Sequence, residues 1–331
     1  MRESKYDVLG IGHAIVDILA NTDDAFLNEH GIAKGAMTLV DGYRADILGR
    51  SMKHPVEASG GSAANTMVGI ASLGGSAAFI GKVNDDRLGQ VFASDIRAAG
   101  VHFDTVPAVG DVATASSHIL ISPDGQRSMN TYLGCAASLT DADVATAKVS
   151  VAKILYVEGY LWDTPAAKVA IRSAIARARS VGRMVAFTLS DPFCVGRWRD
   201  EFKALLAKDV DILFANELEA EALYQTEDFD DAFQAIRKWG KAAAITRSAL
   251  GSIVLEDWNV HVIDAEPVVR VVDTTGAGDQ YAAGFLFGRA RGLPIEVCGR
   301  LGGLAAAEVI SHVGPRPQAS LKALAANAGL L

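Results

Sequence analysis

Short apolar runs alternate with longer amphipathic stretches along most of this 331-residue chain. Three run-and-stretch pairs share this pattern in the middle of the chain: 153–158 with 165–180, 184–189 with 198–207, and 210–214 with 216–224. Repeated strand and helix units predict a parallel sheet with helices on both faces. The run 6–12 adds a buried first strand. No change of composition divides these units, so the sequence predicts a single large α/β domain.

Two strand-rich segments interrupt this alternation. The first contains the short run 37–41, and the second contains two runs, 118–121 and 127–132, joined by the Pro-Asp-Gly turn at 123–125. Such a turn between apolar and alternating runs is typical of a β-hairpin. We therefore expect a small sheet, formed by about 13–58 and 104–136, that folds over the site as a lid.

Composition narrows the function classes. Half of the residues are hydrophobic and the net charge is −8, and no cluster of basic residues is long enough for a nucleic acid partner. No run is long enough to span a membrane, and no apolar signal segment precedes the first strand. The three cysteines are isolated in the sequence, without metal or redox spacing. We expect a cytoplasmic protein that acts on a small molecule.

The strongest chemical signal is the stretch 268–279, in which β-branched apolar residues predict a strand that leads into a small-residue turn and then a helix. Gly276, Ala277 and Gly278 leave backbone N–H groups open to an oxyanion, and the positive end of the helix dipole points the same way. Asp279 would repel a bound phosphate. We interpret it as a base that accepts a proton from an attacking hydroxyl. The alternative is a first-turn aspartate that only complements the helix dipole.

Other polar residues fall at strand ends and helix starts, where ligands of open α/β sheets gather. Asp17 follows the first strand, and Asn65 comes one turn after a Gly-Gly pair. An amide offers both a donor and an acceptor, which a sugar hydroxyl requires. Asn216 and Glu219 have the spacing of a capping box, which is a purely structural alternative for that pair.

Taken in order, these motifs resemble the signatures of the ribokinase-like carbohydrate and nucleoside kinases. The signature D-T-x-G-A-G-D is complete at 273–279, a Gly-Gly pair precedes Asn65, N-x-x-E occurs at 216–219, and T-x-x-x-x-G occurs at 246–251. The resemblance covers nearly the whole chain. It implies a three-layer α/β sandwich with a central, mostly parallel sheet and a small β-sheet lid. It also implies ATP as phosphoryl donor and an alcohol as acceptor.

Carried over by position, the resemblance implies roles for individual residues. Asp279 would be the catalytic base, and Gly276, Ala277 and Gly278 would stabilise the transferred phosphoryl group. The residues implied to bind the acceptor are Asp17, Gly61, Asn65, His13, Arg127, Glu158 and Tyr160. Those implied to lie along ATP are Asn216, Thr246, Arg247, Gly251, Gly278 and His312. Glu219 would place Mg²⁺ through water, and Asp273 and Thr275 would hold a monovalent cation such as K⁺.

The segments 126–138 and 156–162 resemble the adenosine kinase branch of the family. Tyr160 would then stack on a purine, although an ordinary aromatic in a strand-end cluster explains it equally. His13 stands where both branches usually have a sugar-binding Asn, and Glu158 stands where sugar kinases often bind substrate. Phosphorylation of the 5′-type hydroxyl of adenosine or a related nucleoside is therefore the leading hypothesis. The alternatives are a sugar kinase of the ribokinase or fructokinase type and a nucleoside-binding protein of this fold without turnover.

The oligomeric state stays open at this point. The edges of a lid sheet could pair with a second subunit, because unpaired strand edges invite such contacts. A monomer and a lid-mediated homodimer are both consistent with the sequence.

Overall fold

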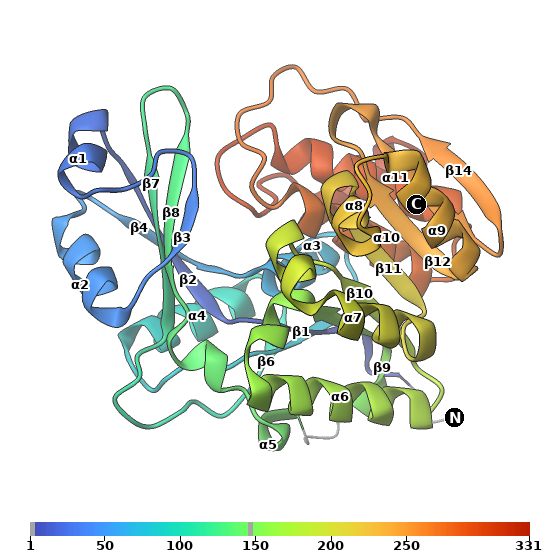
Figure 1. The fold of residues 1–331 in the computed structure, drawn as a ribbon, viewed down its shortest axis with the longest axis horizontal. Coiled ribbons are helices and arrows are strands. Elements are labelled where there is room, and N and C mark those ends of the chain that lie inside the picture. Colours follow the sequence, from blue (N-terminus) through green and yellow to red (C-terminus); the bar gives the residue numbers. More distant parts are fainter. Residues whose placement is uncertain (1–3, 145–147) are drawn as a thin grey trace.

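The computed structural model describes residues 4–144 and 148–331 of the chain. Residues 1–3, part of the N-terminal segment for which we expected no signal sequence, lie outside the described residues. Within the described ranges the chain forms a nine-stranded sheet and a five-stranded sheet (Figure 1). In the same ranges, no helix is both long enough and apolar enough to cross a membrane.

The larger sheet has the strand order β14-β13-β12-β11-β10-β9-β1-β5-β6. Its strands are β1 (Tyr6–Ile11), β5 (Ala77–Ile80), β6 (His102–Phe103), β9 (Ala152–Glu158), β10 (Met184–Thr188), β11 (Ile212–Asn216), β12 (Ala242–Thr246), β13 (Ser252–Glu256) and β14 (Asn259–Ile263). Every pairing is parallel except the two made by β13. The carboxyl ends of β1 and β9 to β12 therefore meet at one edge, as predicted for a ligand-binding α/β sheet.

Helices cover both faces of this sheet. The α-helices are α1 (Asp24–Glu29), α2 (Gly42–Ser51), α3 (Ser62–Ser72), α4 (Arg87–Ala98), α5 (Asp141–Val144), α6 (Pro165–Ser180), α7 (Pro192–Lys208), α8 (Glu217–Tyr224), α9 (Phe229–Trp239), α10 (Ala277–Ala290), α11 (Ile295–Val309) and α12 (Leu321–Asn327). Leu155 and Val157 pack in one apolar core with α6 and α7, whereas Ile154 and Tyr156 pack in a second core with α3 and α10. This alternation along β9 confirms the three-layer sandwich.

The smaller sheet has the order β3-β8-β7-β2-β4. Its strands are β2 (Ile15–Asn21), β3 (Met37–Leu39), β4 (Val56–Gly60), β7 (Ala115–Ile121) and β8 (Arg127–Tyr132). The predicted hairpin is present, because β7 and β8 pair antiparallel around a turn in which Gly125 has a positive φ of 81°. Figure 1 shows this sheet beside the larger one, with α1 and α2 on its outer side. That it acts as a lid stays a prediction.

Two expectations about local structure were wrong. The run 268–272 is irregular rather than a strand, and Val269 and Val271 are exposed, so no sheet partner is there to receive their backbone. The helix expected at 198–207 begins earlier, at Pro192, because Asp191 caps it and proline is favoured in a first turn. Trp198 marks a kink in that helix rather than its start.

Close contacts between glycine and backbone hold α10, whose first turn carries the predicted base. A Cβ on Gly284 of α10 would lie 2.2 Å from the carbonyl oxygen of Leu301 on α11. A Cβ on Gly302 of α11 would lie 2.8 Å from the carbonyl oxygen of Tyr281. Both positions require glycine, and the resulting tight pair of helices fixes the direction in which α10 enters the site.

Candidate active site

A cavity of about 790 Å³ lies where the carboxyl ends of β9 to β12 face the inner side of the smaller sheet. The starts of α3 and α10 close it from a third side. Of the residues predicted from the sequence, the following line it: His13, Asp17, Gly61, Asn65, Glu158, Tyr160, Asn216, Glu219, Thr246, Thr275, Gly276, Ala277, Gly278 and Asp279. Five predicted residues are not among its lining: Arg127, Arg247, Gly251, Asp273 and His312.

The turn that opens α10 uses the N–H of Ala277 on the carbonyl oxygen of Thr274, at 3.2 Å, and leaves open space around Gly278. Gly276 is the N-cap, with a left-handed φ of 79°, and no side chain caps the helix. A Cβ at this position would lie 2.6 Å from the backbone of Pro315, so only glycine fits. A Cβ on Gly278 would meet open space. The uncapped positive end of the helix therefore faces the cavity, as an anion site requires.

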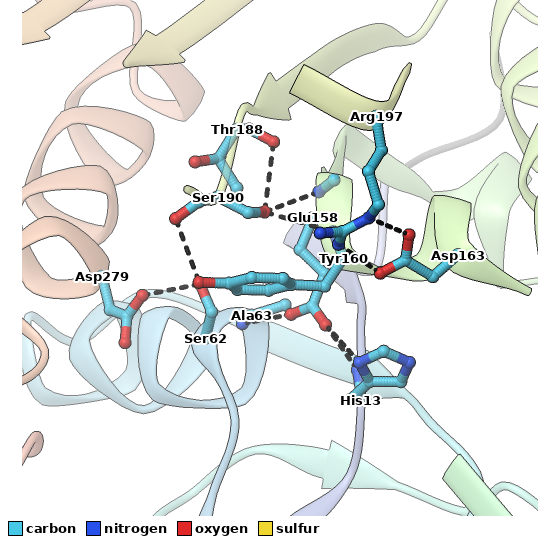
Figure 2. Close-up of polar contacts among 11 residues, drawn as sticks. His13, Ser62, Ala63, Glu158, Tyr160, Asp163, Thr188, Ser190, Arg197 and Asp279 are labelled. Carbon is cyan, nitrogen blue, oxygen red and sulfur yellow. Dashed lines mark hydrogen bonds and ion pairs between the residues drawn. The ribbon is translucent and has the colours of Figure 1, made fainter. Parts of the chain in front are cut away.

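Asp279 is half-buried in the first turn of α10 and faces the start of α3 (Figure 2). Ser62 Oγ donates a hydrogen bond of 2.6 Å to its Oδ1, and Asn65 Nδ2 donates one of 3.2 Å to its Oδ2. Burial raises the pKa of Asp279 to about 6, while these two hydrogen bonds and the charge of Arg316 oppose that shift. The carboxylate is thus ionised at neutral pH but more basic than an exposed aspartate, which suits a proton acceptor.

Asp17, on β2, brings a second carboxyl to the cavity from the smaller sheet. Its side chain packs against Gly60, where a Cβ would lie 2.3 Å from Asp17 Oδ2. Burial raises its pKa to about 7, and the charges of Arg316 and Arg127 oppose the shift. Gly61 has a φ of 98° and could not carry a Cβ, which would meet the carbonyl oxygen of His13 at 2.2 Å. The Gly-Gly pair lets the smaller sheet bring Asp17 close to the start of α3.

Glu158, at the end of β9, uses both carboxylate oxygens on backbone groups (Figure 2). It accepts from His13 N at 2.7 Å and from Ala63 N at 3.0 Å. Burial raises its pKa to about 7 and lowers that of His13 to about 4. His13 is therefore neutral at neutral pH, and its Nε2 is buried without a partner among the described residues. Glu158 joins β9, the segment after β1 and the start of α3.

Tyr160 presents its ring to the cavity from the segment after β9 (Figure 2). Its hydroxyl donates to the carbonyl oxygen of Ser190 at 3.1 Å, and Ser190 Oγ accepts from the N–H of Gly159 at 2.8 Å. Ser190 has a positive φ of 76°, a strained conformation for a residue with a side chain. Ser190 thus holds both the hydroxyl of Tyr160 and its backbone, whose N–H donates to Ser190 Oγ at 3.3 Å.

Sequence reasoning missed several lining residues. Phe193, in the first turn of α7, lines the cavity although it is 81% exposed. Met37 and Leu39 on β3 are exposed lining residues of the same kind. Asp163 and Arg197 form a cavity-lining ion pair of 2.6 Å (Figure 2). The Asp-Pro-Phe sequence after β10 could have revealed Phe193, since the residues after each parallel strand reach this edge.

The predicted nucleotide residues separate into two groups. Asn216 and Glu219 form the capping box of α8, and burial raises the pKa of Glu219 to about 7. Arg247 turns away from the cavity, since its Nε donates to Glu217 Oε1 at 3.0 Å and its guanidinium stacks on Phe229. Its side chain is therefore engaged outside the cavity rather than at the predicted phosphate position.

Two further residues predicted to lie along ATP, Gly251 and His312, do not line the cavity. Gly251 has a φ of 79°, and a Cβ there would meet the carbonyl oxygen of Ile263 at 2.1 Å, so its role is to shape the loop between β12 and β13. His312 contacts Glu308, with Nε2 3.2 Å from Oε1, and it does not line the cavity. An adenine contact for His312 therefore has no support in this arrangement.

Asp273 already has nitrogen partners at the predicted cation position. Its Oδ2 accepts from Gly314 N at 2.8 Å and pairs with Arg127 Nη2 at 2.7 Å, while its Oδ1 accepts from Thr275 N at 3.1 Å. Arg127 comes from β8 of the smaller sheet. Its guanidinium gives Asp273 a positively charged partner at the position where the family resemblance implied a monovalent cation.

No group of three or more His, Cys, Asp or Glu side chains in residues 4–144 and 148–331 is arranged to hold a metal ion. Both oxygens of Glu219 accept hydrogen bonds from Asn216, at 3.0 Å from its N–H and 2.8 Å from its Nδ2. A carboxylate can accept about four hydrogen bonds, so Glu219 keeps capacity for water. This donor set fits a Mg²⁺ ion contacted through water rather than a cage of protein ligands.

Comparison with known proteins places this geometry in a family. The model of a family described as pfkB family carbohydrate kinase matches residues 37–322. The sequence is 54% identical to that of the adenosine kinase from Sinorhizobium meliloti, whose crystal structure superposes with a TM-score of 0.92. The match covers 98% of this chain and 100% of the adenosine kinase chain. A probable sugar kinase from Rhizobium etli is 48% identical, with coverage of 99% and 100% and a TM-score of 0.93. An ATP-dependent ribose-1-phosphate kinase from Halopiger xanaduensis is 34% identical over 243 residues, which is 71% of this chain and 75% of that protein.

Proposed function

Because the chain belongs to the PfkB family of carbohydrate kinases, we propose that it transfers the γ-phosphoryl group of ATP to the 5′-hydroxyl of adenosine or a closely related nucleoside. Its class is that of an ATP-dependent kinase acting on a nucleoside or sugar hydroxyl. Kinases of this family use ATP and typically Mg²⁺. The proposal concerns the identity of the acceptor and the roles of the residues around it.

Asp279 is assigned the role of base. In the proposed reaction its carboxylate accepts the proton of the acceptor hydroxyl while that oxygen forms a bond to the γ-phosphorus, and the bond from phosphorus to the bridging oxygen of ADP breaks. The N–H of Gly278 is assigned to stabilise the charge on the transferred group, whereas the N–H of Ala277 already donates to the carbonyl oxygen of Thr274 at 3.2 Å. Mg²⁺, when bound, supplies neutralisation of the phosphate charge, and Glu219 would contact it through water.

Asp17 and Asn65 are assigned to the remaining hydroxyls of the acceptor. The two side chains come from different elements that line the cavity, β2 and α3, and Asn65 already donates a hydrogen bond to Asp279. A hydroxyl held by these two side chains would bring its neighbour toward the base. Positioning of this kind contributes a large share of phosphoryl-transfer catalysis.

One observation favours a nucleoside over a free sugar as the acceptor: Tyr160 and Phe193 form an aromatic wall of the cavity. Tyr160 and the exposed Phe193 line the same cavity as Asp279 and Asp17. A free pentose or hexose needs hydroxyl partners all around, whereas a nucleoside also presents a flat base, which stacks favourably on aromatic rings. The 54% identical relative is an adenosine kinase, which supports the same choice.

A sugar kinase of the ribokinase or fructokinase type is the second candidate. The relatives that are named as a probable sugar kinase and as a ribose-1-phosphate kinase favour it. The hydroxyl-binding residues would serve either acceptor, so the aromatic wall is the feature that separates the two.

The experiment is an assay of ATP consumption with adenosine, ribose and fructose as acceptors in the presence of Mg²⁺. We expect the highest kcat/KM with adenosine. A higher value with ribose or fructose would replace the nucleoside by a sugar, and an absence of turnover with all three, together with tight adenosine binding, would favour a binding protein.

A further inference from the structure

Arg316 reaches the site from the segment that follows α11, although it does not line the cavity. Its Nε donates to Asn65 Oδ1 at 3.1 Å, and its Nη1 lies 2.9 Å from Asp95 Oδ2 on α4. The side chain is 15% exposed. Its partner Asn65, on α3, is 251 positions away in the sequence, and this contact was not predicted.

The contact with Arg316 determines which way the Asn65 amide points. A guanidinium N–H only donates, so the amide oxygen must face Arg316 and the amide NH₂ must face the other way. On that other side lies Asp279 Oδ2, at 3.2 Å from Asn65 Nδ2. A flipped amide would bring its NH₂ against the guanidinium and its oxygen against the carboxylate, which is unfavourable twice.

We propose that Arg316 is a positioning residue, which holds Asn65 in the orientation that the acceptor hydroxyl and Asp279 require. The proposal rests on the proposed function, since it deepens the account of the same site. Arg316 contacts neither acceptor nor ATP in this account. It acts through Asn65 and through its charge.

The surroundings of Arg316 are fixed on both sides. Asp95, its partner, accepts from Ser59 N at 2.7 Å and from Ser59 Oγ at 2.5 Å. Gln280, on α10, is fully buried and donates to the carbonyl oxygens of Asn65 and Pro315, each at 3.0 Å. The backbones on either side of the contact between Arg316 and Asn65 are thus tied to the helix that carries Asp279. Such a network holds a side chain in one orientation.

The charge of Arg316 is a second, separable effect. Burial raises the pKa of both Asp279 and Asp17, and Arg316 lowers the pKa of each by favouring the ionised form. The other ionisable groups that interact with Asp279 are Asp17, Glu158, Tyr156 and Tyr160. None of these is a cation, and among the described residues the positive charge that lowers the pKa of Asp279 is that of Arg316.

The chain offers a matched control. Arg289, near the end of α10, pairs with Glu256 at 2.8 Å with 20% of its side chain exposed, compared with 2.9 Å and 15% for Arg316. Each arginine also has one buried nitrogen without a partner in the structure, Nε in Arg289 and Nη2 in Arg316. Arg289→Gln therefore removes a comparable ion pair at a distance from the cavity.

Two measurements on the intact protein test the proposal. Calorimetry with adenosine, without ATP, gives the Kd of the acceptor. The pH profile of kcat/KM gives the acid limb, which is the pH range in which kcat/KM falls as the base of the free enzyme is protonated. Arg316→Gln should weaken adenosine binding roughly tenfold, the loss expected for a misplaced charge-supported hydrogen bond, and should move the acid limb to higher pH. Arg316→Lys keeps the charge but not the Nε contact, so it should weaken binding while leaving the acid limb near its original position. Arg289→Gln should change neither.

The outcomes separate this proposal from the proposed function. If the Arg316→Gln and Arg289→Gln variants have the same Kd for adenosine and the same acid limb in the pH profile of kcat/KM, Arg316 has no positioning role. An acid limb in Arg316→Lys that is shifted as far as in Arg316→Gln would overturn the charge effect. A parent protein that binds adenosine without phosphorylating it would contradict the proposed function, yet the Kd values would still test Arg316. Thermal unfolding midpoints of all variants show which are folded, and Arg316→Lys carries the test if Arg316→Gln is not.

Discussion

Arg127 and Asp273 form an ion pair of 2.7 Å that joins the smaller sheet to the turn at the start of α10. Arg127 lies on β8 and also donates to Thr275 Oγ1 at 3.2 Å. Both members of the pair are more than nine-tenths buried. The position of the smaller sheet over the cavity and the geometry of the anion turn are therefore connected through one guanidinium.

Breaking this pair from either side should cost stability. Arg127→Gln or Asp273→Asn leaves a buried charge without its partner, and we expect each to lower the free energy of unfolding by about 3–5 kcal/mol. The double variant should cost less than the sum of the two single variants, because no uncompensated charge remains. Denaturant unfolding measures all three. As control, Arg50→Gln removes an exposed pair with Asp46 and should cost about 0–1 kcal/mol. Strictly additive single and double values would show that the pair contributes nothing.

Replacing Asp279 by Asn should affect catalysis far more than binding. The amide cannot accept the acceptor proton, so kcat should fall by at least about 10²- to 10⁴-fold while ATP affinity is retained. Steady-state kinetics and calorimetry with ATP check the two parts. Asp231→Asn, also in a first helical turn but exposed on α9, is the control and should behave as the parent. Near-normal turnover of Asp279→Asn would remove the base from the mechanism.

The pH dependence follows from the carboxyl groups in the cavity. Burial raises the pKa of Asp279 to about 6 and of Asp17 to about 7. Asp279 must be ionised to accept a proton, and Asp17 is the stronger hydrogen-bond acceptor when it is ionised. Protonation weakens or removes these functions, so kcat/KM should be level above about pH 8 and fall as the pH decreases through about 7 and about 6. Glu158 and Glu219, each with a pKa raised to about 7, titrate in the same range, so the profile gives apparent values. A kcat/KM that is constant down to about pH 5 would contradict the ionised-base mechanism.

Phe193 should separate nucleoside from sugar acceptors. Its ring is largely exposed, so Phe193→Ala should leave the free energy of unfolding nearly unchanged. If the ring stacks on the base, its loss should weaken adenosine binding by about 1–3 kcal/mol, roughly 5- to 150-fold in KM. The KM for ribose should not change. An equal effect on both acceptors would mean that Phe193 shapes the cavity without contacting a base.

Local sequence patterns predicted much of this architecture. The alternation of strand and helix, the hairpin at 118–132 and the turn before Asp279 depend on nearest neighbours in the chain, and all three are present. The strand expected at 268–272 is absent, because a β-branched run becomes a strand only where a partner strand is available.

Side-chain partners were harder to predict, because they depend on contacts between distant segments. Arg247 follows a strand that ends at the cavity, yet Glu217 and Phe229 hold it outside. No contact of Arg316 with α3 was predicted, and its partner Asn65 is 251 residues away. Sequence spacing places the backbone of a site, whereas competing charges and aromatic rings decide where a long side chain points.

The packing of α10 against both α11 and α3 also has a consequence for biosynthesis. Asp279 follows Asn65 by 214 positions, so at about 5–20 residues per second a ribosome exposes the acceptor-binding residues roughly ten seconds or more before it adds the base. Until then, the face of α3 that Gln280 and Ala283 later cover has no partner. A message cut short upstream of Asp279 would therefore yield a chain with an uncovered apolar face on α3 and without the proposed base, which is a substrate for chaperones or proteases rather than a partial enzyme.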